Sequence, residues 1–257
     1  MQAVILCGGK GTRLREETEF RPKPLIEIGN MPILWHIMKT YSHYGIKDFI
    51  LCLGYKGYLI KKFFTELNTY NTDFTYNPKT KKIKYHNHQD IEDWNITFAE
   101  TGLETNTGAR IKKIEKYITE DDFFLTYGDG VADVDIDKLF KFHKKEDKIG
   151  TVTAVRPLAR FGVLNIDGTR IVDFTKKNLV HDGRIDGGYF VFKRKIFDYL
   201  TDDNDCMLEG EPLKNLAKDS QFIAYRHDGF WQCMDTIQHT DLLNQLWKEG
   251  KAEWKVW

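Results

Sequence analysis

The sequence predicts an α/β fold: a mainly parallel, twisted sheet with helices on both faces, plus a smaller antiparallel part. Three observations support this. Apolar runs of strand length alternate with helical, amphipathic segments in the first half of the chain. Glycine-rich turns directly follow two of the expected strands, and strand patterns dominate after Gly150. With 257 residues, 41% of them hydrophobic, the chain is long enough for one large domain with a sizeable core.

The first half of the chain begins with a strand. Ala3–Cys7 is continuously apolar, as expected for a central parallel strand, and glycines follow it at once. Apolar spacing then predicts a helix after Pro32, a second buried strand and a second helix, over 33–41, 48–55 and 58–67. This β-α-β-α order favours right-handed crossovers and a parallel sheet.

Residues 74–100 interrupt that order. A hairpin turning at Asn77-Pro78-Lys79 is expected first, followed by an alternating strand from Trp94. A helix over Ile111–Ile118, a strand leading to Gly128-Asp129-Gly130, and a helix capped by Asp135 or Asp137 come next.

The second half is richer in strands. Asp167-Gly168 marks the turn of a hairpin within 161–174. The other expected strands cover 151–157, 187–192 and 222–228, and the expected helices cover 193–200, 211–218 and about 236–248.

Composition excludes several classes of protein. Lys plus Arg and Asp plus Glu both number 38, so no broad cationic face for nucleic acid is expected. The four cysteines, Cys7, Cys52, Cys206 and Cys233, show no metal or redox spacing, which is typical of reduced cysteines in a cytosolic protein. The apolar run at the N-terminus is too short for a signal peptide or a membrane span.

The stretch Leu6–Leu14, LCGGKGTRL, has the character of a phosphate-binding loop. It matches neither the Walker loop nor the dinucleotide fingerprint. Glycines nevertheless let backbone N–H groups approach a phosphate, and the N-terminus of a following helix would add a favourable dipole. Arg13 adds a forked cation, and Lys23 adds a second cation on a segment stiffened by Pro22 and Pro24.

Asp129 and Asp235 are candidate ligands for Mg²⁺, which prefers oxygen donors and commonly takes one or two carboxylates from protein. Each feature also has a plainer interpretation. Asp129 alone fits a turn, Asp235 a helix cap, Lys23 a solvated loop, and Gly-Gly-x-Gly a simple turn. Their occurrence together, in this order, favours a nucleotide site.

Longer motifs carry a family resemblance. LCGGKGTRLxxxT, RPKPLIEI, TYGDGVADVD and GFWQCMDT resemble the sugar-1-phosphate nucleotidyltransferases. WNITFAETG, TGARIKKI and RFGVL, with PILWHIMKTYSHYGIKDFILCLGYKGYLIKKFF, resemble its glucose-1-phosphate cytidylyltransferase branch. The resemblance covers essentially the whole chain.

The resemblance implies a Rossmann-like nucleotidyltransferase fold in one domain, with a nucleotide-binding half over about 1–130 and an acceptor-binding half over about 131–257. It implies Mg²⁺-dependent transfer of a cytidylyl group from CTP to a sugar 1-phosphate, most simply glucose 1-phosphate, giving a CDP-sugar and pyrophosphate for surface polysaccharide synthesis. It also implies a cytoplasmic homo-oligomer that binds neither nucleic acid nor membrane.

The resemblance also assigns roles to residues. Arg13, Lys23 and Asp129 would be catalytic, and Asp129 and Asp235 would hold Mg²⁺. The nucleotide would be bound by Leu6, Gly8, Gly9, Gly11, Thr12, Arg13, Lys23, Thr101, Gly108 and Arg110. The acceptor would be bound by Tyr127, Arg160, Lys176, Lys177, Asp186, Gly187 and Gly188.

One segment departs from the family pattern. Where the family has Glu-Lys-Pro, this chain has Lys176-Lys177-Asn178, and Asp186 stands where the family has asparagine. A donor-only ammonium cannot replace a carboxylate that accepts hydrogen bonds from sugar hydroxyls without changing what is recognised. Three interpretations stay open: a compensating pair of Asp186 with Lys176, a different phosphorylated acceptor, and a non-catalytic regulatory subunit of the same fold.

Overall fold

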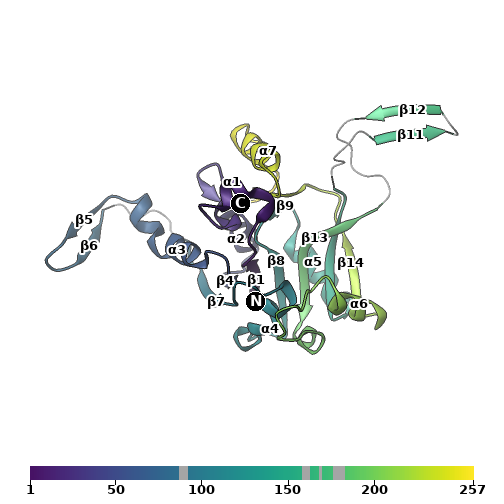
Figure 1. The fold of residues 1–257 in the computed structure, drawn as a ribbon, viewed down its shortest axis with the longest axis horizontal. Helices are drawn as coiled ribbons and strands as arrows, with labels where there is room; N and C mark the ends of the chain where they lie inside the picture. Colours follow the sequence, from purple (N-terminus) through teal and green to yellow (C-terminus); the bar gives the residue numbers. More distant parts are fainter. Residues whose placement is uncertain (87–91, 158–162, 168–169, 176–182) are drawn as a thin grey trace.

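The computed structural model describes residues 1–86, 92–157, 163–167, 170–175 and 183–257. Its centre is a seven-stranded sheet with the order β14-β10-β13-β8-β1-β4-β7 (Figure 1). In chain order these strands are β1 (Gln2–Cys7), β4 (Asp48–Leu53), β7 (Asn95–Glu100), β8 (Asp122–Tyr127), β10 (Gly150–Val155), β13 (Ile185–Lys193) and β14 (Phe222–Arg226).

Strand directions confirm the mainly parallel sheet. β1 runs parallel to both β4 and β8, β4 runs parallel to β7, and β10 runs parallel to β14. β13 is antiparallel to both of its neighbours, β8 and β10. The sheet therefore draws strands from both halves of the chain, and β13 from the second half lies beside β8 from the first.

Each face of the sheet is covered by its own hydrophobic core. Ala3, Ile5 and Cys7 of β1 belong to one core, and the alternating Val4 and Leu6 belong to the other. The first core includes residues of α2 (Ile33–His43), α3 (Gly57–Asn71), α5 (Ile136–Glu146) and α7 (Ile237–Lys248). The second includes residues of α4 (Thr107–Lys113) and α6 (Glu211–Lys218). Helices on both faces are therefore confirmed.

Two of the expected helices differ from the prediction. The segment expected to be helical over Ile111–Ile118 begins earlier, as α4, and ends in a 3₁₀ turn, η3 (Glu115–Tyr117). The segment over 193–200 forms a 3₁₀ helix, η4 (Arg194–Tyr199). Both are short connectors between strands, where the tighter 3₁₀ turn is common. Asp135 caps α5 by accepting a hydrogen bond from the backbone N–H of Lys138, at 2.9 Å.

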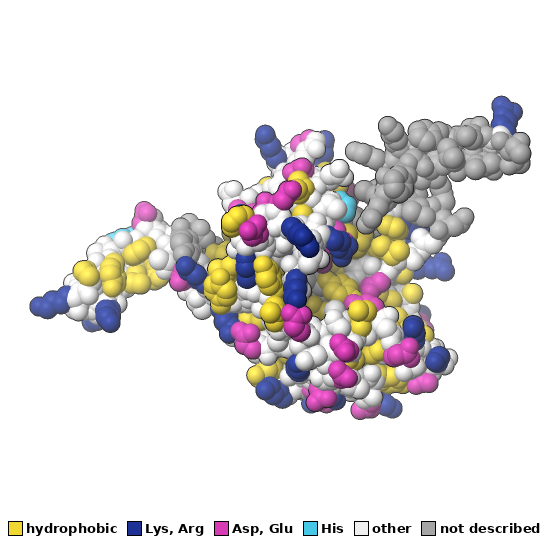
Figure 2. Space-filling view, viewed as in Figure 1, with side chains coloured by type: hydrophobic (Ala, Val, Ile, Leu, Met, Phe, Trp, Pro, Cys, Tyr) yellow, Lys and Arg dark blue, Asp and Glu magenta, His cyan; other side chains and the backbone are white. Residues whose placement is uncertain are grey.

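Two hairpins lie outside the central sheet. β5 (Phe74–Asn77) and β6 (Lys82–Tyr85) pair antiparallel and project from the body beyond α3 (Figure 1). Side chains at the tip of this hairpin are basic (Figure 2). The turn is at the predicted place, since Asn77 Oδ1 accepts from the backbone of Lys79 and Thr80. β11 (Val163–Asp167) and β12 (Arg170–Thr175) also pair antiparallel, although Gly168 at their turn lies outside the described residues.

Two pairs of very short strands are not evident from sequence patterns. β2 (Glu27–Ile28) pairs with β3 (Met31–Pro32), and β9 (Gly130–Ala132) pairs with β15 (Trp231–Cys233). Strands of two or three residues are too short to show an alternating pattern. The second pair joins the loop after β8 to a segment about a hundred residues later. Within the described part of the chain, no helix combines the length and apolarity needed to cross a bilayer.

The segment after α7 is anchored by Trp254, whose side chain has no exposed surface. Its ring lies 5.4 Å from that of Phe230 and 6.4 Å from that of Trp247, measured between centroids. Its indole Nε1 also lies 3.5 Å from Nδ1 of His36 in α2. One side chain therefore joins the last residues to α2, to α7 and to the segment that precedes β15.

We predict that Trp254→Ala lowers the free energy of unfolding by about 3–5 kcal/mol, because truncating a fully buried aromatic leaves a cavity. Urea unfolding followed by circular dichroism measures the change. Trp254→Phe should lower the free energy of unfolding by less, and Glu253→Ala, at the exposed preceding position, should change it by no more than about 0.5 kcal/mol. Equal stability of wild type and Trp254→Ala would contradict the anchoring role.

Candidate active site

Two loops meet because β1 and β8 are adjacent and parallel. Leu6 pairs with Tyr127 at the carboxyl ends of these strands, and the backbone N–H of Gly128 donates to Leu6 O at 3.0 Å. A cavity of about 350 Å³ opens beyond the two ends. It is lined by Leu6, Cys7, Gly8, Gly9, Gly11, Thr12, Arg13, Lys23, Pro24, Thr105, Asn106, Thr107, Arg110, Tyr127, Gly128 and Asp129.

The glycine loop is tightly built. Gly11 has a φ of +63°, and a Cβ there would meet Thr18 Cγ2 at 2.7 Å. Thr18 Oγ1 in turn donates to the carbonyls of Gly11 and Leu14, at 3.2 and 3.0 Å. The expected helix dipole is weaker than predicted, because only a 3₁₀ turn, η1 (Thr12–Leu14), and the four-residue α1 (Arg15–Thr18) follow the loop.

Arg110 holds the loops on this edge of the sheet together. Its guanidinium is buried and donates to the carbonyl oxygens of Gly8 and Leu53, each at 3.0 Å. It also donates to Thr101 Oγ1 at 2.6 Å and to Gly102 O at 2.7 Å. The loops after β1, β4 and β7 are therefore tied to one side chain, which also forms part of the cavity wall.

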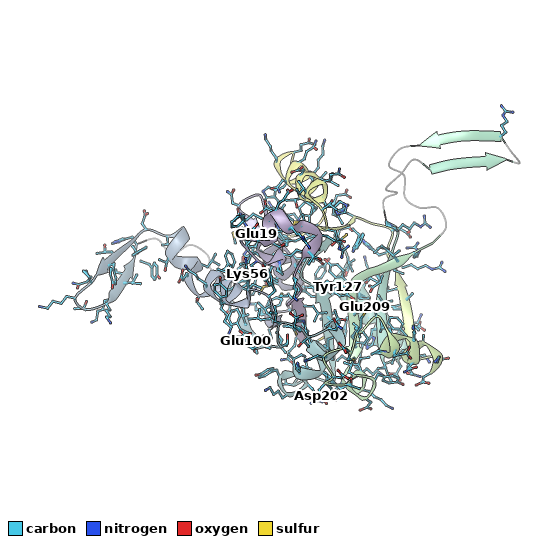
Figure 3. The ribbon with its side chains drawn as sticks, viewed as in Figure 1. Glu19, Lys56, Glu100, Tyr127, Asp202 and Glu209 are labelled. Carbon is cyan, nitrogen blue, oxygen red and sulfur yellow. The ribbon has the colours of Figure 1, made fainter. Side chains whose placement is uncertain are left out.

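A second cavity, of about 310 Å³, adjoins the first. Figure 3 shows Tyr127 and Glu209, two of its lining residues, next to each other. Arg13, Tyr127 and Asp129 line both cavities, so the two meet at these side chains. The second cavity is also lined by Thr126, Gly130, Asp186, Gly187, Gly188, Glu209, Trp231, Cys233 and Asp235.

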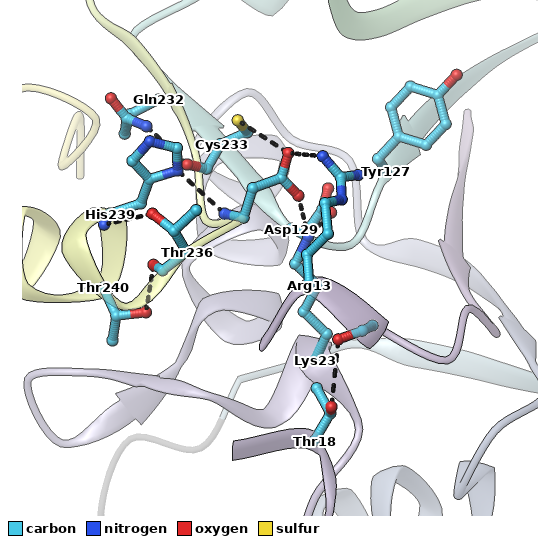
Figure 4. Close-up of polar contacts among 12 residues, drawn as sticks. Arg13, Thr18, Lys23, Tyr127, Asp129, Gln232, Cys233, Thr236, His239 and Thr240 are labelled. Carbon is cyan, nitrogen blue, oxygen red and sulfur yellow. Dashed lines mark hydrogen bonds and ion pairs between the residues drawn. The ribbon is translucent and has the colours of Figure 1, made fainter. Parts of the chain in front are cut away.

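A cluster of charges lies where the cavities meet. Lys23 Nζ donates to Asp129 Oδ2 at 2.6 Å and to Asp235 Oδ1 at 2.5 Å. Arg13 Nη1 donates to the other oxygen of Asp235, also at 2.5 Å. Figure 4 shows Arg13 and Lys23 beside Asp129. Lys23 is buried, whereas the side chain of Arg13 is 68% exposed and open to a ligand.

Opposite charges in this cluster favour the ionised forms of Lys23 and Asp235. Burial alone would lower the pKa of Lys23, but the two carboxylates outweigh burial and raise it above its ordinary value. For Asp235, burial would raise the pKa, but hydrogen bonding and charge from Lys23, with the charge of Arg13, lower it. The pair of Lys23 with Asp235 is therefore ionised at neutral pH.

Asp235 reaches the cluster through the short β9–β15 pair. The backbone N–H of Met234 donates to Asp129 O at 2.7 Å, which fixes the two aspartates side by side. The cap of α7 is Thr236, whose Oγ1 accepts from the backbone N–H of His239 at 3.3 Å. The plainer interpretation of Asp235 as that cap is therefore wrong.

The two aspartates suit a hard divalent cation. Their oxygens already converge on one cation, the Lys23 ammonium, at 2.6 and 2.5 Å. In the described part of the chain, no group of three or more His, Cys, Asp or Glu side chains could hold a metal. Two carboxylates are nevertheless what Mg²⁺ commonly takes from protein when substrate phosphates supply further oxygens.

The structure brings together most of the residues that sequence reasoning assigned to the nucleotide and the metal. Thr101 and Gly108 are exceptions, because neither lines a cavity. Thr101 donates to Leu53 O, and Gly108 packs against Cys206. Of the acceptor residues, Tyr127, Asp186, Gly187 and Gly188 line the second cavity, whereas Arg160, Lys176 and Lys177 lie outside the described residues.

Sequence reasoning missed other lining residues. Trp231 and Cys233 could have been found, since they belong to the same motif as Asp235. Thr107 could have been found in the same way, since it is the first residue of the motif TGARIKKI. Thr105, Asn106 and Glu209 carry no sequence signal of their own, because packing alone brings their loops to the cavities.

Comparisons with known proteins show the family and the fold. A family model described as nucleotidyl transferase matches residues 2–246. The chain is 46% identical to a glucose-1-phosphate cytidylyltransferase of Salmonella typhi over all of both chains. It is 30% identical to a mannose-1-phosphate guanyltransferase of Gibberella zeae, over 98% of this chain and 67% of that one. The solved structure of HddC from Yersinia pseudotuberculosis shares the fold, with a TM-score of 0.68 and 24% identity over 96% of this chain and 99% of that one.

We predict that Lys23→Met lowers the free energy of unfolding by about 2–3 kcal/mol, because it leaves two neighbouring carboxylates without their shared cation. Chemical unfolding at pH 7 without divalent metal measures the change. Lys10→Met is the matched control, since the exposed Lys10–Glu104 pair should contribute less than about 1 kcal/mol. Equal effects of the two substitutions would contradict the central role of Lys23.

Proposed function

The chain belongs to the nucleotidyl transferase family, and we propose that it transfers the cytidylyl group of CTP to glucose 1-phosphate. The products are CDP-glucose and pyrophosphate. One observation carries the proposal: the 46% identity with a glucose-1-phosphate cytidylyltransferase extends over the full length of both chains. Two adjoining cavities that meet at a charged cluster supply the geometry that such a reaction needs.

In this proposal CTP occupies the cavity beside the glycine loop, and glucose 1-phosphate occupies the cavity beside Asp186 and Glu209. The α-phosphorus of CTP then lies near Arg13, Lys23 and Asp129, at the boundary between the cavities. The support is that a phosphate chain needs backbone N–H donors and cations, whereas a sugar needs hydrogen-bond acceptors.

The chemistry follows from the substrates. An oxygen of the sugar phosphate, already anionic, attacks the α-phosphorus in line, and the bond from that phosphorus to the β-phosphate oxygen breaks. No general base is required, so catalysis consists of positioning and charge stabilisation. Arg13 is exposed and permanently charged, which suits it to the departing pyrophosphate. Lys23 is held protonated by Asp129 and Asp235 and would stabilise charge at the reacting phosphate.

Asp129 and Asp235 would hold the Mg²⁺ that accompanies CTP. The ion, when bound, supplies positive charge that neutralises phosphate oxygens and orients them. The stiff segment around Lys23 and the β9–β15 pair keep the two carboxylates in position before substrates arrive.

The alternatives from the sequence are less well supported. An acceptor with its own anionic group would face Asp186 and Glu209, which both line the second cavity. A non-catalytic subunit would not need Arg13, Lys23, Asp129 and Asp235 in contact. A single domain, a homo-oligomer and a cytoplasmic location remain predictions; the four free cysteines are in keeping with the last.

We predict that pyrophosphate release in the presence of Mg²⁺ is fastest with CTP and glucose 1-phosphate. The measurement pairs each of CTP, UTP, dTTP, ATP and GTP with glucose 1-phosphate, mannose 1-phosphate, glucosamine 1-phosphate and glucuronic acid 1-phosphate. If CTP is used only together with glucuronic acid 1-phosphate, the proposed nucleotide is right and the proposed acceptor, glucose 1-phosphate, is wrong. Turnover with no pair would contradict the proposed function as a whole.

Asp129→Asn and Asp235→Asn should each lower kcat by about 100-fold or more and raise the Mg²⁺ concentration needed for half-maximal turnover. The amide keeps the shape of the side chain and loses the charge. Asp137→Asn, at an exposed position in α5, is the control and should keep near-normal kinetics. Removing Mg²⁺ with EDTA should abolish turnover of the wild type. An Asp129→Asn variant with unchanged Mg²⁺ dependence would contradict the metal assignment.

A further inference from the structure

A short chain of hydrogen bonds links side chains that line the two cavities. Thr107 Oγ1 donates to Glu209 Oε2 at 2.6 Å, and Tyr127 Oη donates to Glu209 Oε1. Thr107 lines the first cavity, Glu209 lines the second, and Tyr127 lines both. Glu209 therefore lies in the second cavity and is bonded to two residues that line the first, and Figure 3 shows it adjacent to Tyr127.

The partners of Glu209 are themselves fixed. The ring of Tyr127 packs edge-on against Phe190, with centroids 6.0 Å apart. It also covers Gly188, whose φ is +76° and where a Cβ would meet the ring at 2.7 Å. Thr107 Oγ1 accepts from the backbone N–H of Leu208 at 2.9 Å, which ties its hydroxyl to the residue next to Glu209. The carboxylate is thus oriented by groups that cannot easily move.

Glu209 keeps unused capacity to accept hydrogen bonds. A carboxylate offers about four acceptor positions, and Thr107 and Tyr127 occupy one on each oxygen. The side chain is exposed, and Glu209 is one of the residues that line the second cavity.

We propose that Glu209 is a specificity-determining residue that accepts hydrogen bonds from hydroxyl groups of the acceptor sugar. The proposal rests on the proposed function, because it assumes that the sugar phosphate enters the second cavity. It also bears on Lys176-Lys177-Asn178, where this chain lacks the carboxylate that its sequence resemblance leads one to expect. Glu209 supplies a carboxylate to the sugar from a different part of the chain.

A purely structural role for Glu209 predicts something else. If the carboxylate only held Thr107 and Tyr127 in place, its loss would disturb both cavities and slow turnover equally for every acceptor. A direct contact with a hydroxyl instead makes the effect depend on whether that hydroxyl is present. Glu209→Gln separates the two roles, since the amide has the same shape and its oxygen can still accept from Thr107 or Tyr127.

The experiment measures kcat/KM for the wild type and Glu209→Gln with CTP and five acceptors: glucose 1-phosphate and its 2-, 3-, 4- and 6-deoxy analogues. Glu211→Gln is the matched control, because Glu211 is exposed at the start of α6 and lines neither cavity. Thermal unfolding of each variant checks the fold. Should Glu209→Gln be unfolded at the assay temperature, Glu209→Asp takes its place, since it keeps the charge but withdraws it from the sugar.

For the wild type we expect kcat/KM with at least one deoxy analogue to be about tenfold or more below kcat/KM with glucose 1-phosphate, since hydrogen bonds to a charged group are strong. In Glu209→Gln, removing the same sugar hydroxyl should lower kcat/KM by less than about threefold, while KM for glucose 1-phosphate rises about tenfold. The proposal would be overturned if each missing hydroxyl lowered kcat/KM equally in the wild type and in Glu209→Gln. It would also be overturned if Glu209→Gln lowered kcat/KM by the same factor for every acceptor, or were inactive with all of them. A wild type that does not use CTP with glucose 1-phosphate at all would instead overturn the proposed function.

Discussion

The site depends on one buried cation, Lys23, held between two carboxylates that come from distant parts of the chain. Without a shared cation, Asp129 and Asp235 would repel each other where the β9–β15 pair places them. Proline on each side of Lys23 limits the backbone, so the ammonium is delivered from a stiff segment. The charges of Arg13 and Lys23 balance those of the two aspartates, so the reacting region holds charged groups in place but has almost no net charge before substrates arrive. This is a form of electrostatic preorganisation.

The sheet supplies the second constraint. Because β1 and β8 are adjacent and parallel, the loops that follow them must emerge at the same edge. Two loops so close together leave little room for side chains. A Cβ on Gly128 would lie 2.9 Å from Leu6 O, and one on Gly8 would meet the guanidinium of Arg110 at 2.2 Å. The glycines therefore serve the packing of the framework as well as an approach to phosphate.

Sequence reasoning found the parts of this site that local patterns encode. Lys23 and Asp129 follow from proline and glycine spacing, and the mainly parallel sheet follows from apolar runs and alternating segments. The contacts of Arg110 and Glu209 depend on packing between segments that are distant in the sequence, and a local sequence pattern cannot predict such packing. Arg110 was expected at the nucleotide; it lines the first cavity, and its hydrogen bonds go mainly to loop carbonyls. The β9–β15 pair was missed because three-residue strands carry too little periodicity.

The distribution of charge across the two cavities indicates how an acceptor would lie. Arg13 and Lys23 stand where the cavities meet, and Asp186 and Glu209 stand within the second cavity. A sugar 1-phosphate has the same polarity, with its anion at one end and neutral hydroxyls at the other. Binding in the reverse direction would set a dianion against two carboxylates and leave the cations unpaired. Burial and the charge of Glu209 raise the pKa of Asp186 to about 6, which shows that this part of the cavity already disfavours a negative charge. The charges of the described residues thus favour one orientation of the acceptor and a neutral sugar.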